Sequence, residues 1–257
     1  MLSLNSVNSG KPQVGNPEPN PCRGKGAETK ECTKEELAYA TMLGDGYITS
    51  GRYKRKSGVI TECNSWFVFA QSHRHKDYVD WLANLFSCYW KIKKEKRIVS
   101  CGRNNKKYLQ YNFRTKAYPF FTHLRKKVFY PNNRKRITQK ILSKITPLGI
   151  AIWWMDDGNL SSINQFTLCT DSYTLKEVRI IQEWFLSKWN IRWNITKIHR
   201  LQCYMKEGIK LIKLIQDYII LSMKYKITPY YHNLNYTPYK AELLELFQEE
   251  EIVRHSQ

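Results

Sequence analysis

Residues 147–158 read Pro-Leu-Gly-Ile-Ala-Ile-Trp-Trp-Met-Asp-Asp-Gly, and this stretch decides the fold. Proline suits the first position of a helix and glycine suits its end, so the stretch predicts a single helix. Because its residues are apolar around most of the helix, we expect burial on nearly every side, although the run is too short to cross a bilayer. The helix ends in two carboxylates at the negative end of its dipole, where a bound cation would stabilise them.

Residues 36–48 repeat this pattern, because they read Glu-Leu-Ala-Tyr-Ala-Thr-Met-Leu-Gly-Asp-Gly-Tyr-Ile. The repeated segment is again an apolar helix that ends in Asp-Gly, here at Asp45. Residues 33–36 form a capping box, which predicts that the helix begins there. Ala40 and Gly44 lie four residues apart and therefore on one face, where small side chains allow a partner helix to approach closely.

Two such helices, about 110 residues apart, resemble the paired motifs of the monomeric, intron-encoded LAGLIDADG homing endonucleases. The resemblance covers residues 33–236. It implies an α+β fold of two pseudo-symmetric αββαββα repeats, at 33–144 and 145–236, whose two curved antiparallel sheets form a saddle over duplex DNA. Residues 1–32 are rich in Asn, Ser, Gly and Pro and are predicted to be a disordered leader. Residues 237–257 are predicted to be a C-terminal tail.

Alternation and helical periodicity predict the elements between and after the motifs. In the first repeat we expect a strand at 59–71, a helix at 76–90, strands at 91–99 and 106–114, and a helix at 118–129. In the second repeat we expect a strand at 165–170, a helix at 175–188, strands at 192–198 and 201–206, and a helix at 209–221.

The charge of the chain predicts a polyanionic partner. Lys and Arg number 42 against 22 Asp and Glu, which gives a formal net charge of +20, and 14% of the residues are aromatic. From residue 91 to residue 140, seventeen Lys or Arg face one acidic residue, Glu95. Aromatic side chains are interleaved with these charges, which favours a folded basic surface over a disordered tail.

Seven cysteines without a Cys-x-x-Cys pair argue against a disulfide framework and against a structural zinc site. Free thiols in a reducing compartment are the expectation. The sequence shows neither a secretory signal nor a transit peptide nor a membrane span. We therefore expect a protein that is made inside an organelle, a mitochondrion or a chloroplast, with no membrane partner.

The residues that the resemblance assigns to chemistry are Asp45 and Asp157. Hydrolysis of a phosphodiester needs a hard cation, and carboxylate oxygens suit Mg²⁺. The family pattern places the catalytic carboxylate directly before glycine, which favours Asp157 over Asp156. Asp156 and Gly44 would then offer their backbone carbonyls as metal ligands. Two or three divalent ions are expected at the paired site, with Mn²⁺ able to replace Mg²⁺.

Basic and polar residues are expected to complete the site. Lys135 and Lys226 follow the two repeats in similar contexts and correspond to a basic residue that supports hydrolysis in similar enzymes. Two alternatives stay open: plain phosphate contacts, or a shift of the role by one position to Arg134 or by two to Lys224. A water-positioning residue at the end of the second strand is matched by Gln71 and, in the second repeat, by a residue of different chemistry, Asp171. A place at the start of the following helix is the plainer interpretation of Asp171.

DNA contacts are expected from basic residues on the sheet faces, which would read bases in the major groove or bind phosphates. The candidates are Arg52, Lys54, Lys93, Arg97, Lys107, Arg192, Lys197 and Arg200.

Two functions follow from these features. The first is a site-specific, Mg²⁺-dependent endonuclease that cuts double-stranded DNA as a monomer at a long asymmetric target. The second is a maturase that binds its host intron RNA and has reduced or no cleavage. An intein remnant is disfavoured, since the chain has neither a Cys or Ser start nor a terminal His-Asn.

Overall fold

The computed structural model describes residues 32–101, 106–161, 165–229 and 239–247. The predicted leader, apart from buried Cys32, lies outside the described residues, as does the segment 102–105 between the strands predicted at 91–99 and 106–114. Within the described ranges, no helix is long and apolar enough to span a membrane.

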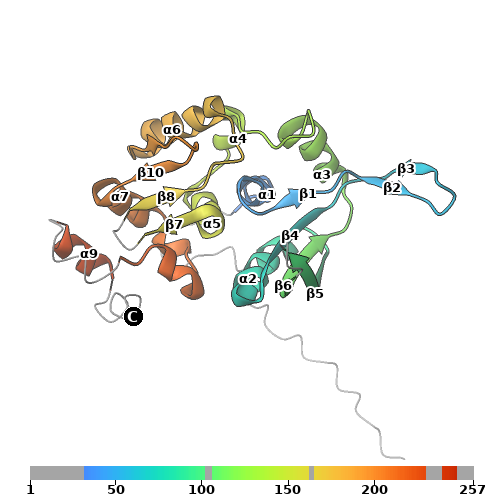
Figure 1. Cartoon of the computed structure of the whole chain (residues 1–257), viewed down its shortest axis with the longest axis horizontal. Coiled ribbons are helices and arrows are strands. Elements are labelled where there is room, and N and C mark those ends of the chain that lie inside the picture. Colours follow the sequence, from blue (N-terminus) through green and yellow to red (C-terminus); the bar gives the residue numbers. More distant parts are fainter. Residues whose placement is uncertain (1–31, 102–105, 162–164, 230–238, 248–257) are drawn as a thin grey trace, which may run out of the picture.

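Two four-stranded antiparallel sheets, one in each repeat, confirm the predicted α+β class (Figure 1). The first sheet has the order β1-β4-β6-β5, formed by Tyr47–Ile48, Phe67–Ser72, Lys106–Thr115 and Ile92–Cys101. The second sheet has the matching order β7-β8-β10-β9, formed by Gly158–Leu160, Phe166–Leu168, Leu201–Cys203 and Asn194–Ile195. The same order in both sheets supports the predicted internal repeat.

The two motif helices, α1 (Lys34–Leu43) and α5 (Pro147–Asp157), pack against each other between the sheets (Figure 1). Thr33 caps α1 as predicted. The carboxylate of Glu36 instead reaches the start of α5, where it accepts a hydrogen bond from the hydroxyl of Thr146. Small residues form the seam, since a Cβ placed on Gly149 would lie 3.4 Å from the Cβ of Ala40.

Gly44 is the tightest point of this seam, because a Cβ added there would overlap the carboxyl group of Asp156. Its φ of −94° lies outside the left-handed region that favours glycine, and the three atoms nearest to the added Cβ all belong to the Asp156 side chain. We expect Gly44→Ala to lower the free energy of unfolding by about 1–3 kcal/mol. Chemical denaturation measures this cost. The double variant Gly44→Ala/Asp156→Ala is the control: most of the cost should disappear in it, whereas simple additivity would contradict the packing described here.

Three longer helices cover the inner faces of the sheets. They are α2 (Lys76–Ser87), α6 (Leu175–Trp189) and α7 (Met205–Ile215). In the first repeat, Phe67 stacks on Phe86 of α2 at a centroid distance of 4.6 Å, and Phe113 lies 5.1 Å from Phe86. In the second repeat, Trp154 packs on Phe166. These aromatic contacts hold the sheets against the helices and so fix where α1 and α5 end.

The single strand predicted at 59–71 is wrong. The structure has β3 (Ile60–Glu62) and β4 separated by a bend, and β3 pairs instead with β2 (Arg52–Lys54) in a hairpin at the right of Figure 1. The cause lies at Ser65, whose N–H donates to the hydroxyl of Thr122 at 2.9 Å and whose carbonyl accepts from the N–H of Tyr118. These bonds replace the ladder that a continuous strand would need.

Further boundaries differ from expectation. The strand predicted at 192–198 is confined to Asn194–Ile195, and the helix predicted at 209–221 ends at Ile215. The predicted strand at 201–206 stops at Cys203, because α7 begins at Met205 and not at Ile209. The predicted helix at 118–129 is divided into α3 (Pro119–His123) and a π-helical segment, η2 (Leu124–Phe129).

Short elements complete the described chain. They are η1 (His73–His75), α4 (Gln139–Leu142), η3 (Gln216–Tyr218), η4 (Leu221–Lys226) and α9 (Lys240–Leu246). In α9, Leu243 is fully buried, and Glu242 pairs with Lys213 of α7 at 2.5 Å.

Candidate active site at the ends of the central helices

The two motif carboxylates, Asp45 and Asp157, lie at the adjoining ends of α1 and α5. The backbone N–H of Asp45, just past α1, donates to Oδ2 of Asp156 on α5 at 3.1 Å. Asp157 is the last residue of α5. Burial, and next the negative charge of Asp45, raise the pKa of Asp157 to about 7. Repulsion of this kind between two carboxylates favours uptake of a cation.

Each helix end also receives a lysine from a later segment of its own repeat. Lys135 Nζ donates to the carbonyls of Gly44 at 2.8 Å and Gly46 at 3.3 Å. Lys226 Nζ donates to the carbonyls of Met155 at 2.6 Å and Asp156 at 3.0 Å. Terminal helix carbonyls carry partial negative charge, so an ammonium group stabilises both ends.

Burial lowers the pKa of both lysines, and the nearby aspartates oppose this effect. Both side chains are therefore directed into the site. A simple contact with phosphate on an exposed surface fits this placement poorly. In the first repeat, the alternative position Arg134 is engaged elsewhere, which favours Lys135 for the predicted role.

The donor atoms fit a hard cation. Mg²⁺ is commonly bound through one or two carboxylates, with water and substrate phosphate completing its octahedron. Asp45 and Asp157 supply such carboxylates, whereas the described ranges contain no group of three or more His, Cys, Asp or Glu arranged to hold a metal ion by themselves. The carbonyls of Gly44 and Asp156, which were predicted as ligands, accept hydrogen bonds from the lysines. A carbonyl oxygen has two lone pairs, so one remains for a cation.

The side chain of Asp156 has a role that the sequence did not predict. Besides the contact with Asp45, its carboxyl accepts a hydrogen bond from the hydroxyl of Tyr78 on α2 at 2.9 Å. Burial raises the pKa of Asp156 well above its usual range, and the charges of Asp45 and Asp157 act in the same direction. Asp156 thus links the two repeats next to Asp45 and Asp157, and Tyr78 holds it there.

Different donors hold the two outer carboxylates. Gln71 Nε2 donates to Asp45 Oδ2 at 2.5 Å, which places this side chain at the candidate site. In the second repeat, Trp153 Nε1 donates to Asp157 Oδ2 at 3.2 Å from within α5. No sequence pattern indicates this contact, because a tryptophan in an apolar helix looks like an ordinary core residue.

The predicted match between Gln71 and Asp171 is wrong. Tyr47 pairs with Val68 in the first sheet, and Gly158 pairs with Leu168 in the second. When the two repeats are aligned on their Asp-Gly motifs and on these strand pairs, the residue that corresponds to Gln71 is Thr170. Thr170 is buried and donates its hydroxyl to the carbonyl of His199. Asp171, one residue further on, is bound by Arg200 through Nε and Nη2 at 2.7–2.9 Å.

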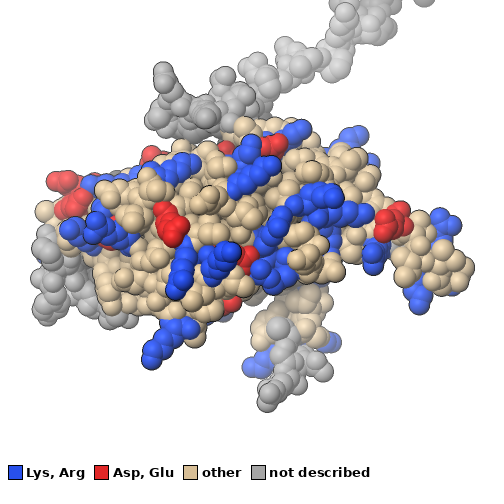
Figure 2. Space-filling model, turned by 90° about the horizontal axis from the view of Figure 1, so that it is seen from above, with Lys and Arg blue, Asp and Glu red and all other residues tan. Residues whose placement is uncertain are grey.

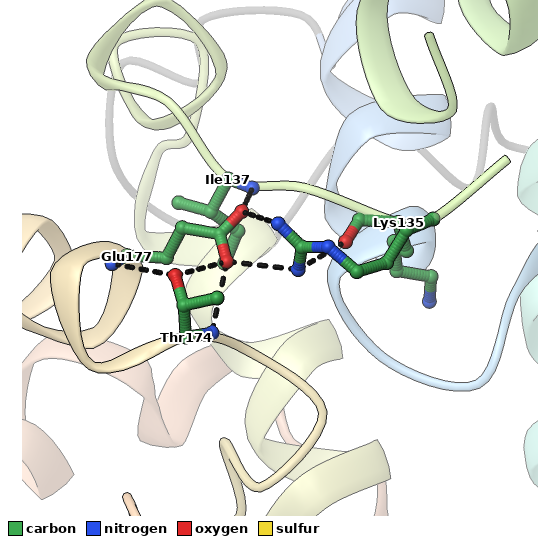
Figure 3. Close-up of polar contacts among 5 residues, drawn as sticks. Lys135, Ile137, Thr174 and Glu177 are labelled. Atoms are coloured by element: carbon green, nitrogen blue, oxygen red, sulfur yellow. Dashed lines mark hydrogen bonds and ion pairs between the residues drawn. The ribbon is translucent and has the colours of Figure 1, made fainter. Parts of the chain in front are cut away.

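Lys135 is anchored from the other repeat by an ion pair (Figure 3). Arg134 donates through Nη1 and Nη2 to the carboxylate of Glu177 on α6 at 2.9 and 3.1 Å, and Nη1 also reaches the carbonyl of Lys135. Glu177 accepts further bonds from the N–H groups of Ile137 and Thr174. Burial opposes ionisation, yet these bonds lower the pKa of Glu177 to about 2. The side chain of Lys135 points away from this network (Figure 3).

We expect Glu177→Gln to lower the free energy of unfolding by about 2–3 kcal/mol, because the amide places a donor against several existing donors. Asp171→Asn is the matched control: its ion pair with Arg200 is exposed, so the loss should stay below about 1 kcal/mol. Urea unfolding of both variants measures the difference. Equal losses would show that the Arg134–Glu177 pair is an ordinary surface pair.

The structure brings some of the predicted DNA-binding residues together and separates others. Lys93 and Arg97 flank Glu95 on one face of β5, at 2.9 and 3.2 Å. Alternation along β6 places Lys107 on the opposite face, which it shares with buried Phe113.

The other candidates lie outside this cluster. Arg52 and Lys54 are on the β2–β3 hairpin, Arg192 and Lys197 are exposed beside β9, and Arg200 is paired with Asp171. Figure 2 shows Lys and Arg spread across one face of the molecule, with fewer acidic residues.

The second sheet presents a different outer surface. Alternation places four neutral polar residues there: Asn159, Thr167, Asn194 and Gln202. Gln202 Nε2 donates to the hydroxyl of Thr167 at 3.2 Å. A search of the sequence for basic residues overlooks these amides, although Asn and Gln pair well with adenine edges.

Fold and site together define a class of protein: a two-repeat α+β chain with a pair of carboxylates where its central helices end. The chain belongs to the LAGLIDADG DNA endonuclease family, whose family model matches residues 36–210.

Similar proteins include the cytochrome b mRNA maturase bI2 of Debaryomyces hansenii, 31% identical over 204 residues, which cover 76% of this chain and 73% of the relative. The intron-encoded endonuclease ai4 of Dictyostelium discoideum is 28% identical over 140 residues, which cover 51% of this chain and 87% of the relative. The structure resembles that of the homing endonuclease I-WcaI bound to its DNA recognition sequence, with a TM-score of 0.61, 23% identity, and coverage of 76% of this chain and 85% of that one. This likeness confirms the fold.

Proposed function

We propose that the chain is a site-specific, Mg²⁺-dependent endonuclease that cuts both strands of a long asymmetric DNA target as a monomer. The observation that carries this proposal is that Asp45 and Asp157 lie at the adjoining ends of two packed helices, each end held by a partly buried lysine. A single chain contains both halves of this arrangement, so one copy suffices for two cuts.

Asp45 and Asp157 would hold the divalent ions, together with the carbonyls of Gly44 and Asp156. Bound there, Mg²⁺, for which Mn²⁺ substitutes, supplies charge that activates water and neutralises the leaving oxygen. Lys135 and Lys226 fix the helix ends and add positive charge close to the scissile phosphates. Gln71 orients the carboxylate of Asp45. The outer faces of the sheets contact the duplex, with Lys93 and Arg97 on the first.

Cleavage of a randomised duplex library by the purified protein with Mg²⁺ tests the proposal. We expect double-strand breaks at one long sequence, and none when EDTA replaces Mg²⁺. If folded protein cuts no sequence in the library, the endonuclease proposal is wrong.

The alternative is a maturase that binds its host intron RNA. The 31% identical relative named as a cytochrome b mRNA maturase supports it. That name also supports our proposal that this chain is encoded and acts in an organelle, since cytochrome b is an organelle gene product. Asp157→Asn separates the two functions: an endonuclease loses DNA cleavage, whereas a maturase keeps its affinity for intron RNA.

A further inference from the structure

The two halves of the site hold their carboxylates by different means. In the first half, Gln71 reaches Asp45 from the neighbouring strand β4 at 2.5 Å. In the second half, the residue at the corresponding position is Thr170, whose hydroxyl is committed to the carbonyl of His199. The strand that lines the second half therefore offers Asp157 no amide.

Trp153 fills this role from the helix itself. It lies one turn before Asp157 on α5, is almost fully buried, and donates its indole N–H to Asp157 Oδ2 at 3.2 Å. The corresponding residue of α1 is Thr41, whose hydroxyl donates to the carbonyl of Leu37 in its own helix. Neither half thus contains the donor that the other half uses.

We propose that Trp153 is the positioning residue for the second half of the active site, as Gln71 is for the first, and that each governs the cutting of one DNA strand. This inference rests on the proposed endonuclease function. Trp153 is held in place by Phe185, on which its ring stacks at 6.5 Å. A donor fixed by core packing allows Asp157 little freedom to rotate away from a bound ion. Loss of that donor should slow one cut and spare the other.

The chain offers a matched control at Trp193. This residue packs against the same Phe185 at 5.4 Å and is equally buried in the core. Its indole N–H, however, has no hydrogen-bond partner among the described residues. Trp153→Phe and Trp193→Phe therefore make the same change in one aromatic cluster, and they differ in whether a hydrogen bond to a catalytic carboxylate is lost.

The experiment is single-turnover cleavage of the target duplex, labelled on each strand in turn, with Mg²⁺ and saturating protein. We expect Trp153→Phe to slow one strand about tenfold relative to the other, the size expected for one hydrogen bond to a charged group. Gln71→Met should shift the ratio of strand rates in the opposite direction. Trp193→Phe should keep the wild-type ratio, and thermal unfolding should show similar stability for the two tryptophan variants.

Equal slowing of both strands by Trp153→Phe, or a ratio unchanged as in Trp193→Phe, would overturn the positioning role. In that case the wild-type protein still cuts, and the proposed function stands. A wild-type protein that binds the duplex but cuts neither strand refutes the proposed function, and this inference with it.

Discussion

Replacing either Asp45 or Asp157 by asparagine is expected to slow double-strand cleavage at least about a thousandfold while the affinity for DNA persists. Asparagine keeps the shape of the side chain but removes the negative charge that holds a divalent ion. In the wild-type protein the two carboxylates lie close enough for the charge of Asp45 to raise the pKa of Asp157. Cleavage assays with Mg²⁺, and binding assays with Ca²⁺ in its place, measure the two effects separately.

Asp217→Asn provides the control for these variants, because Asp217 lies on η3, is exposed and is far along the chain from both motifs. Its cleavage rate should match the wild type. Full activity of Asp157→Asn would show that this carboxylate holds no essential ion. Asp156 would then be the candidate for the catalytic carboxylate of the second motif.

Asp157→Asn is also expected to stabilise the metal-free protein at neutral and alkaline pH, by up to about 4 kcal/mol. The pKa of Asp157 is about 7 in the folded protein, against an ordinary value of 3.8 for a free aspartate. The folded state therefore holds this proton more tightly than the unfolded state. The resulting stability is complete below about pH 4 and is lost as the pH rises through about 7. Asparagine, which is always neutral, does not suffer this loss.

Denaturant unfolding of both proteins in EDTA, from pH 4.5 to pH 8, measures this effect. The advantage of the variant should be small at the acidic end and reach its full size near pH 8. Added Mg²⁺ should stabilise the wild-type protein more than the variant, since the cation relieves the repulsion. An advantage that does not depend on pH would mean that Asp157 is ionised at little cost in the folded protein.

The two Asp-Gly motifs predict the centre of the site. Each motif is one continuous segment, and its apolar residues alone indicate a buried helix that ends at the aspartate. The lysine positions followed from similar local contexts in the two repeats. The sequence does not reveal the ion pair beside Lys135, because that pair joins segments that are distant in the chain. Arg134 and Glu177 are 43 residues apart, and nothing in either neighbourhood indicates that they pair.

Tyr78 and Trp153 were missed for a different reason. Both are buried aromatic residues on helices, and packing explains them fully until the polar end of each side chain is placed. The mismatch of Gln71 with Asp171 came from strand register, which depends on pairing partners. The sequence does not show that the strand is interrupted near Ser65, so the first residue of β4 cannot be located from the sequence.

The most direct test of the central claim is a crystal structure of the protein with its target duplex and Mn²⁺, located by anomalous scattering. We expect metal ions within coordination distance of both Asp45 and Asp157 and of the scissile phosphates. Ions bound elsewhere, or carboxylates turned away from the DNA, would contradict it.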